Sequence, residues 1–140
     1  MAAAKNPSEQ AVLDFFVTLS SGDLNALALL LHEDASWEPM VRDIPGAGVH
    51  QGRDTVINEF LAPVRGTFRA GDPKVHVAAL VSDGDRVMAE TRATGQRADG
   101  KPYDNRYAWA FELRDGKILR IREYMDSLYV ARWFDMIPSA

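Results

Sequence analysis

The sequence predicts an α+β fold in which helices come first along the chain and a curved antiparallel sheet follows. Helical apolar spacing marks the first third of the chain, and four segments of alternating polarity fill the second half. The last two of these segments are joined by Asp115-Gly116. This dipeptide is typical of a hairpin turn, because glycine adopts positive φ without steric cost.

Composition indicates one globular domain. With 140 residues and 46% hydrophobic content, the chain can bury a core, so we assign residues 1–140 to one domain with 1–6 as a flexible start. The net charge of −4 argues against a nucleic-acid partner. No apolar run reaches the roughly 18 residues of a membrane span, and no signal peptide is recognisable. The absence of cysteine is compatible with a cytoplasmic protein.

The first two helices are predicted from their caps. Asn6 is a suitable cap, Pro7 suits the first helical position, and Glu9 completes a capping box. The segment 20–22, which ends in glycine, terminates this helix. Asp23 then caps a second, shorter helix that continues to about residue 32 and is nearly all apolar, so it should be well buried.

The following elements complete the predicted order α-α-β-α-β-β-β-β. Residues 35–40 are expected to form a short strand or an extended edge. Pro39 has no N–H to donate to a neighbouring strand, so it is not expected in a central strand. Asp54 caps a third helix that closes at residues 63–66. Strands are expected at 74–82, 86–96, 103–114 and 117–126, and a short terminal helix at 127–135.

Alternation divides the last hairpin into two faces. On its first strand, one face carries Asn105, Tyr107, Trp109, Phe111 and Leu113. On its second strand, one face carries Leu119, Ile121, Glu123 and Met125, and the other carries Ile118, Arg120, Arg122, Tyr124 and Asp126. One face must pack on the helices, although a register error of one residue would exchange the two faces.

The order of elements and several short motifs resemble the family of nuclear transport factor 2, ketosteroid isomerase and the SnoaL-like polyketide cyclases. The motifs are Gly22-Asp23, Gly52-Arg53-Asp54, Asp115-Gly116-Lys117-Ile118 and Glu123-Tyr124-Met125-Asp126. The resemblance covers nearly the whole chain. It implies a cone, in which a curved sheet wraps the N-terminal helices and leaves an apolar pocket at its open end. It also implies a homodimer through the sheet, with Arg120 and Arg122 at its rim or on a solvated face.

The resemblance to ketosteroid isomerase implies Glu38 as a general base. In that enzyme an Asp-Pro after the second helix supplies the base, and Trp37-Glu38-Pro39 stands at the matching place. A carboxylate at an apolar pocket mouth, beside Trp37 and Met40, would have a raised pKa that suits proton transfer near neutral pH. The alternative is that Glu38 is a solvated edge residue.

The other catalytic groups of ketosteroid isomerase are not matched. The position of the oxyanion-hole tyrosine holds Phe15, and the position of the protonated aspartate holds Trp109. An enolate needs hydrogen-bond donors aimed at its oxygen. Steroid isomerisation by the usual mechanism is therefore not expected.

Asp126 is the second candidate, because the ending Tyr-x-Asp is similar to that of limonene-epoxide hydrolases. In those enzymes two aspartates and an arginine activate water and protonate the epoxide oxygen. Their Arg-x-Asp motif is broken here, since Thr91 and Ala93 occupy its positions. A rearranged site would use Glu90, Arg92 and Asp126. The alternative is that Asp126 caps the terminal helix.

His50, in the glycine-rich loop expected at the pocket rim, is a third candidate acid or base. No two histidines have metal-ligand spacing, so no metal site is expected. The residues expected to bind substrate are Phe15, Trp37, Met40, Phe60, Arg92, Asn105, Tyr107 and Trp109. Such a wall suits a flat apolar ligand with a few oxygens. Core packing is the alternative role of the aromatic residues.

These observations favour a small enzyme that performs acid–base chemistry on an apolar, oxygenated molecule without a cofactor. Two alternatives stay open. The first is a ligand-binding protein with the same pocket, which needs no pair of titrating groups. The second is an assembly subunit, in which Phe15, Trp37 and Trp109 would fill the cavity.

Overall fold

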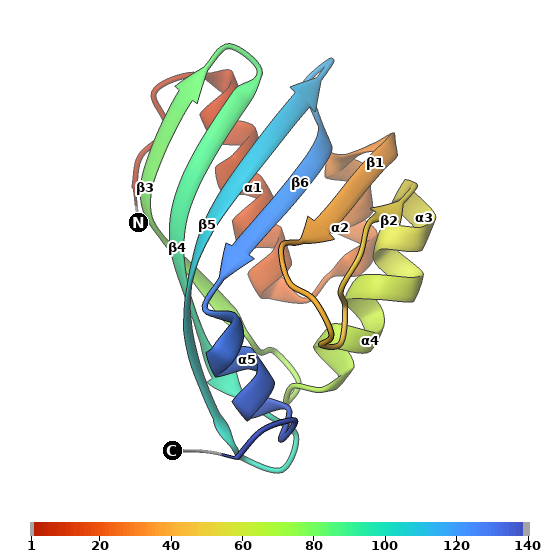
Figure 1. Ribbon diagram of the computed structural model, residues 1–140. Helices are drawn as coiled ribbons and strands as arrows, with labels where there is room; N and C mark the ends of the chain where they lie inside the picture. Colours follow the sequence, from red (N-terminus) through yellow and green to blue (C-terminus); the bar gives the residue numbers. More distant parts are fainter. Residues whose placement is uncertain (1, 139–140) are drawn as a thin grey trace.

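The computed structural model describes residues 2–138, which form a curved six-stranded sheet with helices packed against it (Figure 1). The strands are β1 (Leu31–Pro39), β2 (His50–Gln51), β3 (Lys74–Asp83), β4 (Arg86–Gln96), β5 (Pro102–Arg114) and β6 (Lys117–Met125). Their order across the sheet is β2-β1-β6-β5-β4-β3. The β1 and β6 strands run parallel, and the other neighbours are antiparallel. The predicted α+β class is confirmed.

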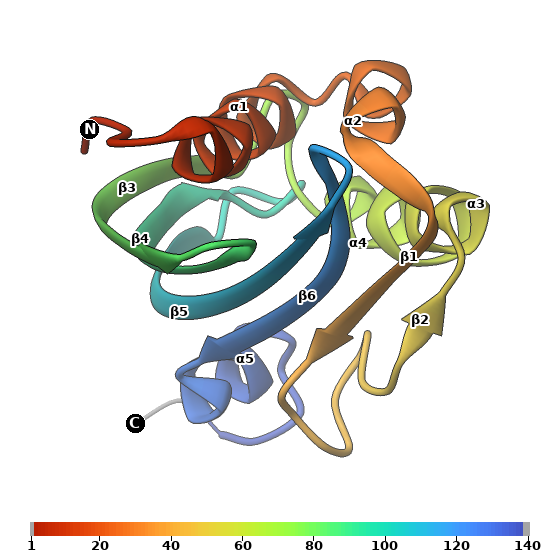
Figure 2. The same cartoon turned by 90° about the horizontal axis from the view of Figure 1, so that it is seen from above.

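Helix α1 (Pro7–Ser21) packs inside the curve of the sheet (Figure 2). The side chain of Asn6 caps its start by accepting a hydrogen bond from the Glu9 amide, and Gly22 ends it with φ 78°. Both predicted caps are confirmed. Helix α2 (Leu24–Leu30) is capped by Asp23 as predicted, but it ends earlier than predicted, because the chain is already extended at Leu31.

The third helical segment consists of α3 (Arg53–Thr55), the π-helical turn η1 (Val56–Leu61) and α4 (Ala62–Gly66). Its cap is Gly52, with φ 94° and no side-chain hydrogen bond, so the predicted cap at Asp54 is wrong by two residues. The apolar residues of η1 are buried. This segment covers the part of the concave face that α1 leaves open.

Strand β1 is longer than predicted and lies inside the sheet, between β2 and β6. Pro39 is its last residue, where the missing N–H costs little, and the next amide, that of Met40, donates to the Glu123 carbonyl at 2.7 Å. The two-residue strand β2 was not predicted. It pairs with Ser36 and Trp37.

A β-bulge interrupts the β5–β6 hairpin near its turn. Glu112 pairs with Arg120, but Leu113 pairs with Ile118, so Leu119 is the extra residue. Ile118 and Ile121 are therefore both buried. The predicted face of β6 is correct from Ile121 onward and wrong at Leu119, because one extra residue reverses the alternation.

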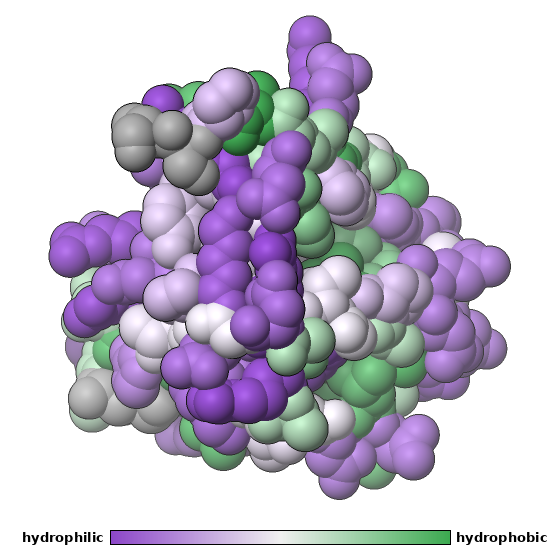
Figure 3. All heavy atoms as spheres, turned by 90° about the horizontal axis from the view of Figure 1, so that it is seen from below, coloured by the Kyte–Doolittle hydropathy of each residue, from purple (hydrophilic) through white to green (hydrophobic). Residues whose placement is uncertain are grey.

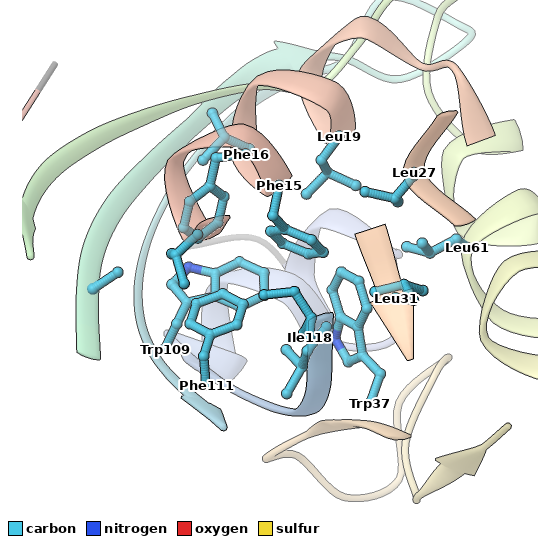
Figure 4. Packing of buried hydrophobic residues seen from close by; sticks show 14 of the residues in the cluster. Phe15, Phe16, Leu19, Leu27, Leu31, Trp37, Leu61, Trp109, Phe111 and Ile118 are labelled. Atoms are coloured by element: carbon cyan, nitrogen blue, oxygen red, sulfur yellow. The ribbon is translucent and has the colours of Figure 1, made fainter. Parts of the chain in front are cut away.

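The core is centred on aromatic side chains of α1, β1 and β5. Figure 4 shows Phe15 pointing from α1 into the space between Trp37, Trp109 and Phe111. The ring centroid of Phe15 lies 5.6 Å from that of Trp37, 6.4 Å from that of Trp109 and 5.3 Å from that of Phe111. Tilted and edge-on contacts of this kind stabilise more than buried area alone.

The start of α1 is fixed to the β3–β4 hairpin by a buried acid. The Glu9 carboxylate is 1% exposed and accepts hydrogen bonds from Ser82 Oγ at 2.6 Å and from Asn6 Nδ2 at 3.3 Å. The Ser82 hydrogen bond is the main cause of the lowered pKa of Glu9. The residues before α1 lie along β3, where the Ala2 amide donates to the Val77 carbonyl at 3.0 Å.

The opposite end is held by an ion cluster. Arg97 binds both Asp99 and Asp135, and Lys101 also binds Asp135. Together they join the β4–β5 turn to the end of α5 (Ser127–Trp133). Viewed from below, this end shows a band of hydrophilic residues with hydrophobic residues beside it (Figure 3).

Gly95 of β4 allows the loop before β3 to approach the sheet. A Cβ at this position would lie 2.9 Å from Asp72 Cβ and 3.2 Å from the backbone Cα of Pro73. Gly95→Ala should therefore destabilise the fold by about 1–3 kcal/mol, the usual cost of overpacking. Urea denaturation measures this loss. Gly66→Ala is the matched control, because a Cβ at Gly66 meets no atom within 4 Å. Equal stability of the two variants would contradict the prediction.

Candidate functional site

An apolar cavity of about 110 Å³ lies between the concave face of the sheet and the helical segments. Its walls come from β1, β4, β5 and β6 on the sheet side, and from η1, α4 and α5 on the other. The volume is enough for several water molecules. Mostly apolar walls with a few polar groups are typical of small-molecule sites.

Glu123 of β6 is the acidic side chain among the residues that line this cavity. Its Oε1 accepts a hydrogen bond from the indole N–H of Trp37 at 2.9 Å. Burial raises the pKa of Glu123 to about 7, because desolvation disfavours the carboxylate, and the single bond from Trp37 opposes this effect only in part. Both protonation states of Glu123 are therefore populated near neutral pH.

Two tyrosines of β5 line the same cavity beside this carboxyl group. The hydroxyl groups of Tyr103 and Tyr107 share a hydrogen bond, and Asn105 Nδ2 donates to the Tyr103 hydroxyl at 3.3 Å. Burial raises the pKa of Tyr103 to about 12 and that of Tyr107 well above its usual range, so both stay neutral. Tyr107 pairs with Met125 in the sheet register, which makes it a diagonal neighbour of Glu123.

The indole N–H groups of Trp37 and Trp109 both donate hydrogen bonds within the protein. Trp37 donates to Glu123, and Trp109 donates to Thr91 Oγ1 at 2.8 Å. The N–H of Trp109 therefore already has an acceptor within the protein. The tyrosine hydroxyls are the other side-chain donors on this wall.

The structure places Glu38 away from the cavity, which differs from the sequence prediction. Trp37 and Pro39 line the cavity, and alternation along β1 puts Glu38 on the opposite face of the sheet. There it stands opposite Arg122 of β6.

Asp126 and His50 are likewise not among the residues that line the cavity. The Asp126 carboxylate accepts from the Tyr129 amide at 3.0 Å and caps α5, which is the alternative that the sequence left open. His50 Nε2 makes a 2.7 Å hydrogen bond with the Gly46 carbonyl, and its ring stacks on Phe60 at 4.3 Å.

The predicted substrate-binding residues divide into two groups. Trp37, Phe60, Tyr107 and Trp109 line the cavity. The other four do not line the cavity. Phe15 is part of the core, Met40 is 41% exposed, and Asn105 donates a hydrogen bond to the Tyr103 hydroxyl. On the outer face, the Arg92 guanidinium donates to the two carboxylate oxygens of Asp104 at 2.7 and 2.6 Å.

Several cavity residues were not named as candidates from the sequence. Glu123 shared a predicted face with Ile121 and Met125, and an acid on an apolar face was the available signal. Tyr103, Arg65 and Trp133 gave no comparable signal, because their positions depend on contacts between distant parts of the chain.

Residues 2–138 contain no group of three or more histidine, aspartate or glutamate side chains placed to hold a metal ion. Over the same residues, no helix has the length and apolar character needed to cross a membrane. The outer face of the sheet exposes Val81, Met88 and Tyr124. The homodimer and the cytoplasmic location stay predictions.

The curved sheet, its covering helices and the apolar cavity between them define a fold like that of nuclear transport factor 2. The model of the SnoaL-like domain family matches residues 12–121, and the chain belongs to this family. The resemblance proposed from the sequence is confirmed. None of the curated proteins matches the chain.

Several solved structures are similar over most of the chain. Bal32a, from a soil-derived mobile gene cassette, is 28% identical with a TM-score of 0.76, covering 88% of this chain and 92% of its own. A protein of Burkholderia xenovorans LB400 described as like nuclear transport factor 2 is 26% identical with a TM-score of 0.72. The match covers 94% of this chain and 98% of that protein. TerC, co-crystallised with polyporic acid, is 20% identical with a TM-score of 0.79, covering 93% and 99%, and shares the fold.

The burial of Glu123 predicts that stability falls as pH rises. Its pKa is about 7 in the folded protein against 4.5 for an ordinary glutamate, so the folded state binds more protons between these values. The free energy of unfolding should therefore decrease from about pH 5 to about pH 7 and level off above. At about 1.4 kcal/mol for each pKa unit, the loss is on the order of 3 kcal/mol.

Urea denaturation of the wild type and of Glu123→Gln, each at about pH 5 and pH 8, measures this effect. Glu123→Gln should show the smaller loss, since it cannot ionise. Glu38→Gln is the matched control and should behave as the wild type. An unchanged pH dependence in Glu123→Gln would show that the Glu123 carboxyl is solvated.

Proposed function

We propose that this protein is a cofactor-independent acid–base enzyme that moves a proton on an apolar, oxygenated small molecule, with Glu123 as the base. The observation that carries this proposal is a partly buried carboxyl group, held by one hydrogen bond, on the wall of an apolar cavity. A general base works best when its pKa lies near the operating pH, and the pKa of Glu123 is about 7.

The proposed reaction begins with proton abstraction from carbon. The Glu123 carboxylate takes a proton from a carbon next to a carbonyl group, and the electron pair of the C–H bond moves toward the carbonyl oxygen. The resulting enolate oxygen accepts a hydrogen bond from the Tyr107 hydroxyl, which stays neutral because of its burial. Tyr103 and Asn105 position that hydroxyl from behind.

The proton then leaves Glu123 in one of two ways. Return of the proton to a different carbon of the enolate completes an isomerisation. Alternatively, the enolate carbon attacks a second carbonyl carbon of the same molecule, and Glu123 gives its proton to the new alkoxide, which completes a cyclisation. Neither route requires an oxidant, a reductant or a metal ion.

A ligand-binding protein with the same cavity is the second candidate. The observation that favours it is the hydrogen bond between the Tyr103 and Tyr107 hydroxyls, which gives each group a partner without a ligand. A binding protein would retain ligand affinity without exchanging protons between ligand and solvent.

Proton exchange tests catalysis without knowledge of the product. A panel of enones, hydroxy-ketones and epoxides is incubated with the protein in D₂O, and deuterium incorporation is followed by NMR. Exchange at carbons next to a carbonyl group should rise with pH through about 7 and then level off, because the base must be ionised. Glu123→Gln should slow exchange about 10²–10⁴-fold. Glu38→Gln is the control and should keep the wild-type rate. Equal rates in wild type and Glu123→Gln would sink the proposal.

The hydroxyl of Tyr107 is expected to act on the enolate. Tyr107→Phe should lower kcat about 10²-fold with a small change in KM, since the hydrogen bond strengthens as charge develops on the oxygen. Tyr124→Phe is the matched control, because Tyr124 is exposed on the outer face of the sheet. A change confined to KM would assign Tyr107 to ground-state binding instead.

A further inference from the structure

The α5 side of the cavity holds a buried donor that lacks an acceptor. The Trp133 side chain is 3% exposed, stacks on Phe68 with ring centroids 4.7 Å apart, and meets the ring of Tyr103 edge-on at 5.0 Å. Its indole nitrogen is buried and has no hydrogen-bond partner within residues 2–138. Buried N–H groups are rarely left unpaired, so this one marks the place of a missing acceptor.

Arg65 is among the residues that line the same cavity, and its guanidinium lies beside Gly22 at the end of α1. Arg65, in the last turn of α4, is half-buried, and within residues 2–138 its side chain makes no hydrogen bond or ion pair. The nearby acid, Asp72, already accepts from the Gln96 amide at 3.1 Å and pairs with Arg69 at 3.4 Å. Burial lowers the pKa of Arg65, because a partly desolvated cation without a partner is disfavoured.

Phe68 contacts both of these residues. The Phe68 amide donates to the Arg65 carbonyl at 3.1 Å, and the Phe68 ring stacks on Trp133. Phe68 therefore links the backbone of Arg65 to the ring of Trp133, and both Arg65 and Trp133 line the cavity. The Arg97 side chain, which donates to the Trp133 carbonyl at 2.8 Å, helps to hold α5 in this position.

We infer that the substrate of this site is an apolar carboxylic acid, whose carboxylate binds Arg65 and the indole N–H of Trp133 while its reacting carbon faces Glu123. This inference rests on the proposed function for the role of Glu123. A carboxylate fits both groups, since guanidinium presents paired donors and the indole N–H adds one more. A neutral ligand of the same shape leaves the cation unpaired, so the site selects for the charged group.

The bound carboxylate also affects the base. A second negative charge in the same apolar cavity favours protonated Glu123. The pH at which the rate levels off should therefore be higher with saturating substrate than for the free enzyme.

The experiment compares 2-naphthoate with 2-naphthamide, its neutral analogue, by isothermal titration calorimetry at about pH 6, where the acid is ionised and Glu123 largely protonated. The wild type should bind naphthoate about tenfold more tightly than naphthamide. Arg65→Met should weaken naphthoate binding about tenfold and leave naphthamide binding within about threefold. Arg65→Lys, which keeps the charge but loses the paired donors, should fall between the two.

Two further variants separate position from charge. Arg106→Met removes one positive charge from the exposed outer face of β5 and should leave both affinities unchanged. Trp133→Phe keeps an aromatic ring against Phe68 but removes the N–H, and should weaken naphthoate binding about threefold or more.

Three results would overturn the inference: no preference for naphthoate, a preference that survives in both Arg65 variants, or no naphthoate binding at millimolar concentration. The proposed function is tested by a separate measurement. Glu123→Gln should keep the preference for naphthoate, whereas loss of its deuterium exchange concerns proton transfer alone.

Discussion

The contact of Phe15 with aromatic side chains of the sheet is the constraint on which the rest of the structure depends. A strongly curved sheet needs a large side chain at its centre of curvature, and Phe15 of α1 supplies it between Trp37 and the aromatic residues of β5 (Figure 4). The same packing orients the indoles. Trp37, held by Phe15 on one side and by Phe60 at 5.3 Å on the other, points its N–H at Glu123. The contact that stabilises the core therefore also places the donor for the proposed base.

Glu9 and Glu123 show how hydrogen-bond partners decide the protonation state of a desolvated carboxyl group. Glu9 accepts hydrogen bonds from the Ser82 hydroxyl, the Asn6 amide group and the Lys5 amide, so its pKa is lowered and its charge stabilises the fold. Glu123 accepts one hydrogen bond from Trp37, and its pKa is raised to about 7. A carboxyl group in this position destabilises the fold whenever it is ionised. Stability alone therefore does not explain the presence of this carboxyl group on an apolar wall.

Local sequence patterns predicted the elements well wherever a short-range contact determines the geometry. The caps at Asn6 and Gly22 and the turn at Asp115-Gly116 depend on residues within a few positions of one another. The sequence did not predict strand β2, which depends on pairing with Ser36 and Trp37, or the bulge at Leu119, which depends on the exact register of the β5–β6 hairpin. The early end of α2 has the same origin, since Leu31 pairs with Ile118 across the sheet.

The same distinction explains the candidate site. Glu38 was chosen by its place in a short motif, but the direction of its side chain is fixed by Trp37, whose large ring must enter the core and thereby turns the next residue outward. Glu123 was already assigned to the face that carries Ile121 and Met125, and alternation alone could not show that this face is concave. Once the contact with Phe15 fixes the direction of Trp37, the pairing of β1 with β6 brings Glu123 within reach of its indole. In a strand whose inward face is otherwise apolar, the acid on that face is therefore a stronger candidate than an acid that matches a motif.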